Sequence, residues 1–583
     1  MQSNTNQPAE AGFTLPGGRT VNPWLALVSL LFGFFMALLD ATIMNIAIPD
    51  IQTKLQTDLT TVTWALNAYS LTFAVLLVTM GRLADQYGRK RIFMFGMIVF
   101  SLASLLCALS GTIGGWTGTP GVNWLIGFRA LQGIGASSMN AVSLALVTAI
   151  FPAEKRGAAM GVWGASSGLA AAAGPVLGGF LIQNFDWRWI FFVNLPFCLV
   201  GLVMVTLFVP ENRDHNTSKA VDVAGVLTLS GTIFCLVLAI MQGNDWGWSS
   251  PTIIGLLVAT VVLLALFVLV ELRQRYPIVD FSLFKRRSFS ATNVVMFLFG
   301  FAMQGGSLIL VLYFVNLLGY DELGAAYALI PFPLASFVVS AIAGRIRTNP
   351  QILGLIGTFL LTVSLVTFAL LTPDASYLDI VWRGILFGAG MGLVFQAFPA
   401  IVLSEVPRTK LGVGSGIFNT FRQIGFSLGV AVLISLFTGQ IQANMQQAST
   451  NAVSIVQADT KLPQPMRDGI VQGLKSAKTN SSNYREGASG GNSSNQFDLT
   501  KLADQLPPQV PEQQRNAIRT ELKDINSQIQ HEFKAQMTHA FTATWWAAAV
   551  ASLLSFLGAF LARAPKRSEI NTEQAKELAM SAH

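Results

Sequence analysis

Two ionisable residues within apolar segments are the strongest candidates for chemistry in this sequence. Asp40 lies in an apolar run over 23–48, and Arg129 lies in another over 122–150. An ionised side chain inside a membrane span costs about 2.5–3.5 kcal/mol on insertion scales, so both are expected to face the interior of a helix bundle. Burial raises the pKa of a carboxyl group and water access lowers it again, as a proton carrier requires. We therefore expect Asp40 to take up and release a proton.

Structural roles for these residues remain open alternatives. Asp40 can instead accept hydrogen bonds that hold the outer end of its span, and Arg129 can extend its charged head to a membrane interface. Arg383 and Arg422 also lie in apolar runs. Each of these two arginines is expected either to have a structural role or to repel protons between transport cycles.

Polar and aromatic side chains in the apolar runs are candidates for a substrate cavity, because polar groups in spans tend to point inward and aromatic rings can receive flat or cationic ligands. The candidates are Asn45, Trp64, Asn67, Tyr69, Gln132, Gln304 and Asn316. Each can equally form an interhelical hydrogen bond or belong to an interfacial aromatic belt. Acids other than Asp40 are scarce in the runs, which leaves neutral, weakly basic and anionic substrates open.

The sequence contains no constellation typical of an enzyme or a metal site. Its four histidines are scattered, no phosphate-binding lysine motif is present, and Cys107, Cys198 and Cys235 all lie in apolar runs. The cysteines therefore fit packing roles better than a disulfide framework. We expect a protein that is not an enzyme and that needs no metal or cofactor.

The composition is that of a membrane protein. Of 583 residues, 52% are hydrophobic and only 11% are charged. A soluble domain carries about a quarter charged residues, so this chain has too few to cover a water-facing surface. The apolar runs reach the roughly 20 residues that a spanning helix needs. They lie at about 23–48, 62–80, 91–111, 122–150, 158–183, 189–209, 222–241, 252–271, 289–316, 323–344, 352–371, 378–403, 412–438 and 541–562.

Basic residues predict the orientation of these fourteen spans. One set of alternate short loops holds Arg82, Arg89, Lys90, Arg91, Lys155, Arg156, Arg213, Lys219, Arg273, Arg275, Lys285, Arg286, Arg287, Arg345, Arg347, Arg408 and Lys410. The other set offers only Lys54 and Arg188. Lysine and arginine are retained on the cytoplasmic side, so both termini are predicted to be cytoplasmic. The net charge of +7 is explained in this way, without a nucleic-acid partner.

One long polar loop, over 439–540, is predicted to lie outside the cell membrane. Its flanks carry apolar residues at helical spacing: Ile434, Phe437, Ile441, Met445, Ala448, Ala452 and Ile455, then Ile518, Leu522, Ile525, Ile529 and Phe533. Each set forms one stripe on a helix. We expect the last two spans to extend outward as a packed hairpin with a flexible tip at 479–495. A largely disordered linker is the alternative.

Internal repetition divides the chain into two halves. Arg129 precedes Gly157 by 28 positions, and Arg383 precedes Gly412 by 29, each across a glycine-containing span and a basic loop. Two halves in the same orientation are typical of transporters built from parallel repeats, with a site between them near the midplane. The runs at 222–241 and 252–271 fall outside the repeat and indicate an inserted hairpin.

The segment GRLADQYGRKR, from Gly81 to Arg91, resembles the signature loop of the major facilitator superfamily. We expect a tight connection between the second and third spans. The resemblance implies a conformational latch formed by Gly81, Asp85, Gly88, Arg89 and Lys90. In that family the aspartate contacts the start of a helix in the opposite half, where a helix N-terminus favours a carboxylate. Here that helix is expected to begin near Leu411, while the counterpart around Gly344 lacks an acid.

Further motifs resemble those of the fourteen-span drug:proton antiporters in that superfamily. A fifth-span antiporter motif is matched by Gly164, Gly168, Gly174, Pro175, Gly178 and Gly179. Its glycines allow close helix packing, and Pro175 weakens the backbone ladder, so the motif is a plausible pivot. Tight packing without function is the alternative. The segments Leu39–Pro49, Trp187–Pro196 and Trp246–Trp248 also resemble this subgroup, and Arg129 resembles its fourth-span arginine linked to proton coupling.

The resemblance implies an all-α membrane protein with the major facilitator fold, in which two six-helix bundles and two inserted helices make fourteen spans. The expected divisions are a tail (1–22), a first bundle (23–209), the inserted hairpin with its linkers (210–288), and a second bundle (289–583) that includes the external loop and a cytoplasmic tail (563–583).

The implied function is proton-coupled efflux of small, mostly hydrophobic molecules across a bacterial cytoplasmic membrane, driven by the proton gradient. Export of one endogenous metabolite, siderophore or peptide is an alternative. Another is an assembly protein that docks a periplasmic or other envelope partner through the external hairpin.

Overall fold

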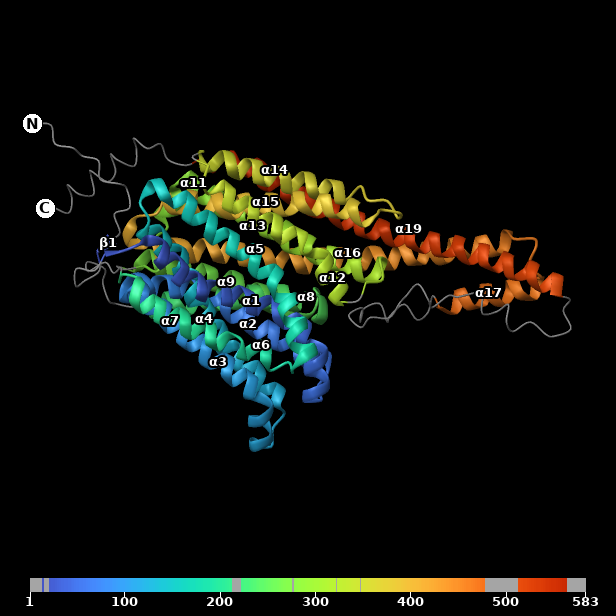
Figure 1. The fold of residues 1–583 in the computed structure, drawn as a ribbon, viewed down its shortest axis with the longest axis horizontal. Coiled ribbons are helices and arrows are strands. Elements are labelled where there is room, and N and C mark those ends of the chain that lie inside the picture. The colour runs from blue at the N-terminus through green and yellow to red at the C-terminus, as the bar shows by residue number, and fades with distance from the viewer. Residues whose placement is uncertain are drawn as a thin grey trace, which may run out of the picture.

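The computed structural model describes residues 13–14, 20–211, 222–274, 277–320, 322–346, 348–477 and 512–563. Apart from one short antiparallel pair, β1 (Phe13–Thr14) with β2 (Thr20–Val21), its regular elements are helices. The helices lie side by side in one bundle, and two of them run far beyond the others at one end (Figure 1). The membrane fold expected from composition is therefore confirmed.

The first half of the chain forms helices that correspond to the first six apolar runs. They are α1 (Pro23–Leu55), α2 (Leu59–Tyr87), α3 (Arg89–Thr117), α4 (Gly121–Ile150), α5 (Ala153–Asn184), and the short α6 (Trp189–Phe192) followed by α7 (Asn194–Phe208). The pair α8 (Val223–Trp246) and α9 (Pro251–Arg273) comes next. Asp222 caps α8 by accepting a 2.8 Å hydrogen bond from the backbone N–H of Gly225.

The second half repeats this pattern with longer final helices. Its elements are α10 (Ser282–Lys285), α11 (Arg287–Leu312) with a π-helical end η1 (Tyr313–Leu317), α12 (Glu322–Leu329), α13 (Pro331–Ala343), α14 (Pro350–Phe368), α15 (Tyr377–Ser404), the 3₁₀ turn η2 (Arg408–Lys410), α16 (Leu411–Ala458), α17 (Gln464–Ala477) and α19 (Glu512–Ala559).

Twelve of the helices in the described ranges are long and apolar enough to cross a membrane. The other two predicted spans are α5 and the pair α12–α13, so all fourteen apolar runs are helical. The tenth run is interrupted between α12 and α13, where Pro331 begins the second helix. A proline inside a helix removes a hydrogen bond and clashes with the preceding turn, which explains the break.

The tight connection expected within the signature segment is a single residue. Helix α2 continues to Tyr87 and α3 begins at Arg89, so Gly88 alone connects them. Gly88 has a φ of 113°, which only glycine adopts without strain, and its N–H donates to the carbonyl of Ala84. Most of the signature residues are therefore held rigidly on helices.

The two longest helices, α16 and α19, continue beyond the rest of the bundle and pack against each other (Figure 1). Each has 48 residues, which corresponds to about 72 Å, more than twice the roughly 30 Å hydrocarbon core of a bilayer. The residues predicted for a flexible tip, 479–495, lie outside the described residues.

A separate apolar core holds the far end of this pair together with α17, and we call these three segments the hairpin. Its buried residues are Ala452, Val456, Leu462, Ile470, Val471, Leu474, Leu522, Ile525 and Ile529. On α19 the core residues recur at the predicted helical spacing, whereas α17 was not anticipated from the sequence. Since these side chains cluster apart from the membrane-spanning core, the hairpin has its own source of stability.

We predict that Leu522→Ala destabilises the hairpin by about 2–4 kcal/mol, because it leaves a cavity where the leucine is fully buried. Amide hydrogen exchange of the full-length protein should then accelerate in α17 and the adjacent part of α19, but not in α1–α7. The exposed Thr520→Ala on the same helix is the control and should leave exchange unchanged. Equal acceleration in both variants would contradict a distinct hairpin core.

Candidate functional site

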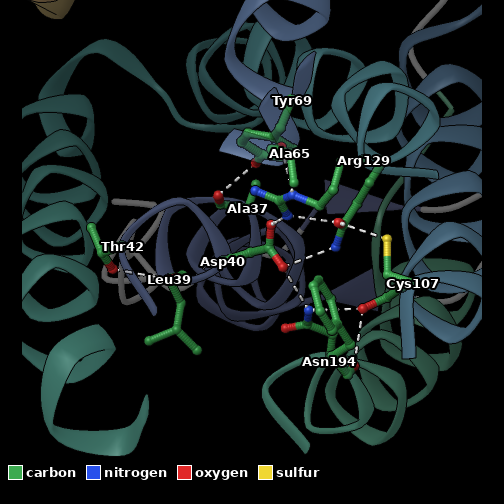
Figure 2. A network of polar contacts seen from close by, with 12 residues as sticks. Ala37, Leu39, Asp40, Thr42, Ala65, Tyr69, Cys107, Arg129 and Asn194 are labelled. Atoms are coloured by element: carbon green, nitrogen blue, oxygen red, sulfur yellow. Dashed lines mark hydrogen bonds and ion pairs between the residues drawn. The ribbon is translucent and has the colours of Figure 1, made fainter. Parts of the chain in front are cut away.

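Asp40 lies at the centre of a buried polar network in the first half (Figure 2). Its carboxylate forms an ion pair with Nη1 of Arg129, and its second oxygen accepts hydrogen bonds from Gln132 Nε2 at 2.9 Å and Asn194 Nδ2 at 3.0 Å. Asp40 is 1% exposed, and Arg129, Gln132 and Asn194 are fully buried. Charge-assisted hydrogen bonds from three side chains therefore replace water around this carboxylate.

Arg129 is held in place by contacts on several sides. Its Nε donates to the carbonyl of Ala65 at 3.2 Å, and its Nη1 also donates to Gln132 Oε1 at 2.7 Å. The guanidinium carbon lies 4.2 Å from the centre of the Tyr69 ring, whose hydroxyl donates to the carbonyl of Ala37. Within the described ranges its Nη2 has no hydrogen-bond acceptor. Asp40 is thus the carboxylate that balances this cation, while two neutral oxygens and the Tyr69 ring complete its surroundings.

Four helices supply Asp40, Arg129 and the side chains closest to them. Asp40 comes from α1, Tyr69 from α2, Arg129 and Gln132 from α4, and Asn194 from the first turn of α7. Figure 2 shows Asn194 approaching the carboxylate from the side opposite Tyr69. A change in the protonation or pairing of Asp40 would therefore change contacts on four helices at once.

Asn194 and Ser104 belong to the network although they were not singled out as site residues. Asn194 Nδ2 also donates to Ser104 Oγ at 3.0 Å, and Ser104 Oγ donates to the carbonyl of Phe191 at 2.9 Å. Asn194 begins α7 directly after the break that follows α6. Its place within the subgroup segment Trp187–Pro196 was the available signal.

The seven predicted cavity residues do not form one group. Tyr69 and Gln132 belong to the Asp40 network. Asn45 is exposed, and the structure leaves the remaining four half-buried, namely Trp64, Asn67, Gln304 and Asn316. The ring of Trp64 lies 6.4 Å from that of Trp246 at the end of α8, and Asn316 lies on the π-helical turn η1.

The carboxylate of Asp85, on α2, lies against the N-terminus of α16 in the second half of the chain. Its carboxylate accepts hydrogen bonds from the backbone N–H groups of Gly412 at 2.9 Å and Val413 at 3.0 Å. Arg89, one turn further, donates to the same carboxylate at 2.8 Å and 3.0 Å. The unsatisfied N–H groups and the positive end of a helix dipole stabilise a carboxylate at this position.

Glycines permit this approach between α2 and α16. A side chain on Gly81 would collide with the backbone of Gly412, and one on Gly412 would collide with Gly81 and Asp85. The other signature residues face elsewhere. The Lys90 backbone N–H donates to Glu211 at 3.2 Å, its Nζ donates to the carbonyl of Thr206 at 2.8 Å, and Gly88 lies against the Glu211 carboxylate. Gly81, Asp85 and Arg89 therefore form the contact with the second half.

A second crossing joins the halves at the same end of the bundle. Gly157 and Gly161 of α5 pack against the backbone at Gly344, and Ser340 Oγ donates to the carbonyl of Gly161 at 2.9 Å. As the sequence indicated, no acid is present at this crossing in the described residues. Small residues alone bring α5 and α13 together here.

The predicted pivot glycines distribute over two neighbours of α5. Gly168 packs against Pro333 and Ser336 of α13, whereas Gly174 and Gly178 pack against Thr42 and Ile43 of α1. Gly179 is buried, and α5 continues through Pro175 without a break. The motif therefore places α5 beside α1, one turn from Asp40.

Asp280 and Lys410 form an ion pair at 2.6 Å beside the start of α16. Burial raises the pKa of the Asp280 carboxyl, but hydrogen bonds from Lys410 and Ser282 outweigh it and lower the pKa to about 2. A carboxyl group with a depressed pKa contributes stability that is lost only as the pH falls through that value. This ion pair therefore persists throughout the physiological pH range.

The Major Facilitator Superfamily model matches residues 30–430, well over half of the chain. The chain belongs to the major facilitator superfamily. It is 32% identical to the tetracenomycin C resistance and export protein of Streptomyces glaucescens, over 76% of this chain and 81% of that protein. It is also 32% identical to multidrug resistance protein Stp of Mycobacterium tuberculosis, over 74% and 78% of the two chains. These relatives agree with the drug antiporter subgroup expected from the motifs.

Two more distant similarities extend this picture. The chain is 28% identical to riboflavin transporter RibZ of Clostridioides difficile, over 74% of this chain and 92% of that one. The solved structure of the human organic anion transporter MFSD10 has a TM-score of 0.53 at 14% identity and covers 71% of this chain and 94% of its own. At that identity, the similarity to MFSD10 supports the fold alone. The superfamily consists of transporters, so this chain is a multi-pass membrane transporter and not an enzyme.

We predict that Asp85→Asn opens the contact between α2 and α16. Each hydrogen bond to a charged acceptor is worth about 1.5–3 kcal/mol, so weakening two of them should change the ratio of closed to open molecules at least tenfold. Spin labels on cysteines at the exposed positions Tyr87 and Thr409 would report this as a longer, broader distance distribution.

The control for this measurement is Asp58→Asn, which removes an acid at the opposite end of α2 and retains a residue that can cap the helix. Its distance distribution should match that of the wild type. If Asp85→Asn also matches the wild type, Asp85 does not hold the two halves together.

Proposed function

We propose that the protein exports small, mostly hydrophobic molecules in exchange for protons by alternating access. The observation that carries this proposal is the buried ion pair between Asp40 and Arg129, which lies among helices of a transporter fold. Two opposite charges compensate each other in an apolar interior, whereas one alone is costly. Adding a proton to Asp40 therefore changes the energetics of the whole first half.

A proton on Asp40 would neutralise the carboxylate and leave the Arg129 cation without its counter-charge. The hydrogen bonds from Gln132 and Asn194, made to a charged acceptor, would weaken in the same step. These donors lie on α4 and α7, so protonation favours a different packing of those helices against α1. Return of the proton to water restores the pair, which gives the protein two states linked to one titrating group.

The contacts of Asp85 support a conformation that is closed on the cytoplasmic side. The distribution of Lys and Arg supports a cytoplasmic location for the end with Gly81 and Gly412 and for both termini. The Asp85 contact and the glycine crossing of α5 with Gly344 both lie at that end. Toward the other end, α1 has an exposed face at Ala41, Asn45 and Pro49. In this conformation Asp40 would receive its proton from the outer side.

The relatives support drug export, and one supports a second candidate. Their names describe resistance to and export of tetracenomycin C, and multidrug resistance. The riboflavin transporter, similar over nearly its whole length, favours the alternative of one dedicated metabolite as the substrate. In either case the proton gradient across a bacterial cytoplasmic membrane supplies the energy. One inward proton per cycle is worth about 2.3 kcal/mol per 100 mV, enough for roughly fiftyfold accumulation.

The hairpin supports a further candidate, an assembly role with an envelope partner. It has its own core and extends well past the membrane-spanning part of the molecule. A folded projection of this kind is suited to docking another protein, in addition to transport.

We predict that Asp40→Asn lowers proton-driven accumulation at least tenfold, because asparagine cannot carry the proton. Tetracenomycin C and riboflavin are the two probes, and uptake into inverted membrane vesicles is the measurement. Whichever probe accumulates in wild-type vesicles distinguishes a drug exporter from a metabolite exporter. Asp50→Asn, ten residues further along α1, is the control and should accumulate the same probe normally. Undiminished proton-driven uptake by Asp40→Asn would show that coupling resides elsewhere.

Deleting residues 460–505 tests the assembly role, because the deletion removes α17 and leaves the membrane-spanning helices intact. We expect an unchanged transport rate in purified vesicles. Loss of cellular resistance at that unchanged rate would favour docking of a partner. Full resistance in cells would exclude docking as a requirement for export.

A further inference from the structure

Arg422 is a buried cation for which the described residues provide no counter-charge. Helix α16 places it inside the second half, where it is 4% exposed. No carboxylate of the described chain lies within ion-pair distance, and its Nε has no hydrogen-bond acceptor there. Its guanidinium carbon lies 5.7 Å from the ring centres of both Phe395 and Phe426. In the described part of the chain, the partners of the Arg422 guanidinium are these two aromatic rings.

The helices around Arg422 offer no acid that could reach it. Helices α11, α13, α14 and α16 contain neither Asp nor Glu. Helix α15 contains one acid, Asp379, which pairs with Arg383 in the first turns. Asp379 precedes Phe395 by sixteen residues, or about 24 Å along the helix. The acids of α19 precede its membrane-spanning part and lie toward the hairpin.

The position of Arg422 is that of a substrate-binding group. It is eleven residues from the start of α16, or about 16 Å, which is near the middle of a bilayer core of roughly 30 Å. Phe395 lies on α15 where that helix meets the first half, because its backbone packs against Gly164 of α5. Transporters of this architecture bind their substrates near the midplane between the halves.

The electrostatic balance of the interior leads to the same conclusion. Asp40 and Arg129 compensate each other in the first half, so Arg422 adds an uncompensated positive charge. A buried charge is retained at such a cost when function requires it, and an anion is the group that relieves the cost.

We propose that Arg422 binds the anionic group of an exported organic anion whose aromatic or apolar body lies against Phe395 and Phe426. The planar guanidinium suits two-point contact with a carboxylate, and the two rings supply apolar surface on either side. Because Arg422 is closed off in this conformation, the anion reaches it only when α15 and α16 move apart from the first half. This assignment deepens the exporter function proposed above and names a substrate class for it.

Three naphthalene derivatives with the same ring and a negative, neutral or positive substituent test the proposal: 1-naphthoate, 1-naphthylmethanol and 1-naphthylmethylammonium. Binding to the purified full-length protein is measured by equilibrium dialysis at neutral pH. The wild type should bind naphthoate at least tenfold more tightly than the alcohol. Arg422→Gln should remove that preference and leave binding of the alcohol unchanged. Arg422→Lys should be intermediate, because it keeps the charge and loses the planar fork.

The exposed Arg345→Gln is the matched control, because it removes the same charge at the surface and should keep the preference for naphthoate. Without any probe, Arg422→Gln should unfold at the same temperature as the wild type or higher, since it removes an unpaired buried charge. Equal wild-type binding of naphthoate and the alcohol, or no binding of naphthoate, would overturn the proposal. So would an equal loss of all three probes in Arg422→Gln, or a lower unfolding temperature, which would assign Arg422 to structure.

The dialysis measurement uses no gradient, so its result is independent of proton coupling. Loss of proton-driven transport in Asp40→Asn is compatible with either binding result. The failure of one proposal is therefore distinguishable from the failure of the other.

Discussion

A charge inside a bilayer is costly without a compensating partner, and this cost organises the first half of the molecule. The Asp40–Arg129 pair is compensated internally, and the hydrogen bonds that complete it come from α2, α4 and α7. Four helices thus share one electrostatic centre. Because the cost of an unpaired buried charge is several kcal/mol, the proposed protonation of Asp40 would alter how these helices pack. The apolar interior of the fold has a low dielectric, so the loss of one charge there has a large energetic effect.

Two contacts between the halves, one at Gly81 and one at Gly344, differ in their chemistry. At one, Asp85 binds the N-terminus of α16 across a glycine-to-glycine approach. At the other, α5 and α13 meet through Gly161, Gly344 and the hydroxyl of Ser340, without a charge. The charged contact gains directional hydrogen bonds, whereas the second relies on close packing, which is easily separated and re-formed. The electrostatic attraction at these two contacts is therefore concentrated at Asp85.

The positions of the helices could be predicted because a span needs about twenty apolar residues, and that pattern is local in sequence. Asp40 and Arg129 could be singled out because ionised residues are rare in such runs. Their pairing could not, since it depends on how α1 and α4 rotate against each other. Asn194 is informative only once the break between α6 and α7 is known. Gln132 and Tyr69 were expected to line a cavity, and the structure places them beside the ion pair.

Local sequence patterns did not predict the full extent of α2 and α3, or the presence of α17. The signature segment has the composition of a turn, yet packing continues α2 and α3 almost to contact at Gly88. Helix α17 was missed because it is only fourteen residues long within a Gln-rich and Asn-rich segment. Its apolar residues acquire meaning only against α16 and α19, which are close in space and distant in sequence.

The continuity of α16 gives the hairpin a mechanical connection to the membrane-spanning core. This helix begins at the Asp85 contact and runs unbroken past Ala452 and Val456 of the hairpin core to its end at Ala458. Its first residues lie between the halves and its last residues lie beyond the bundle, so a tilt of α16 about its start would move the hairpin. For a helix of about 70 Å, a tilt of roughly 10° at the Gly412 crossing displaces the far end by about 12 Å. Each transport cycle would thus displace the hairpin end of α16 by several ångströms.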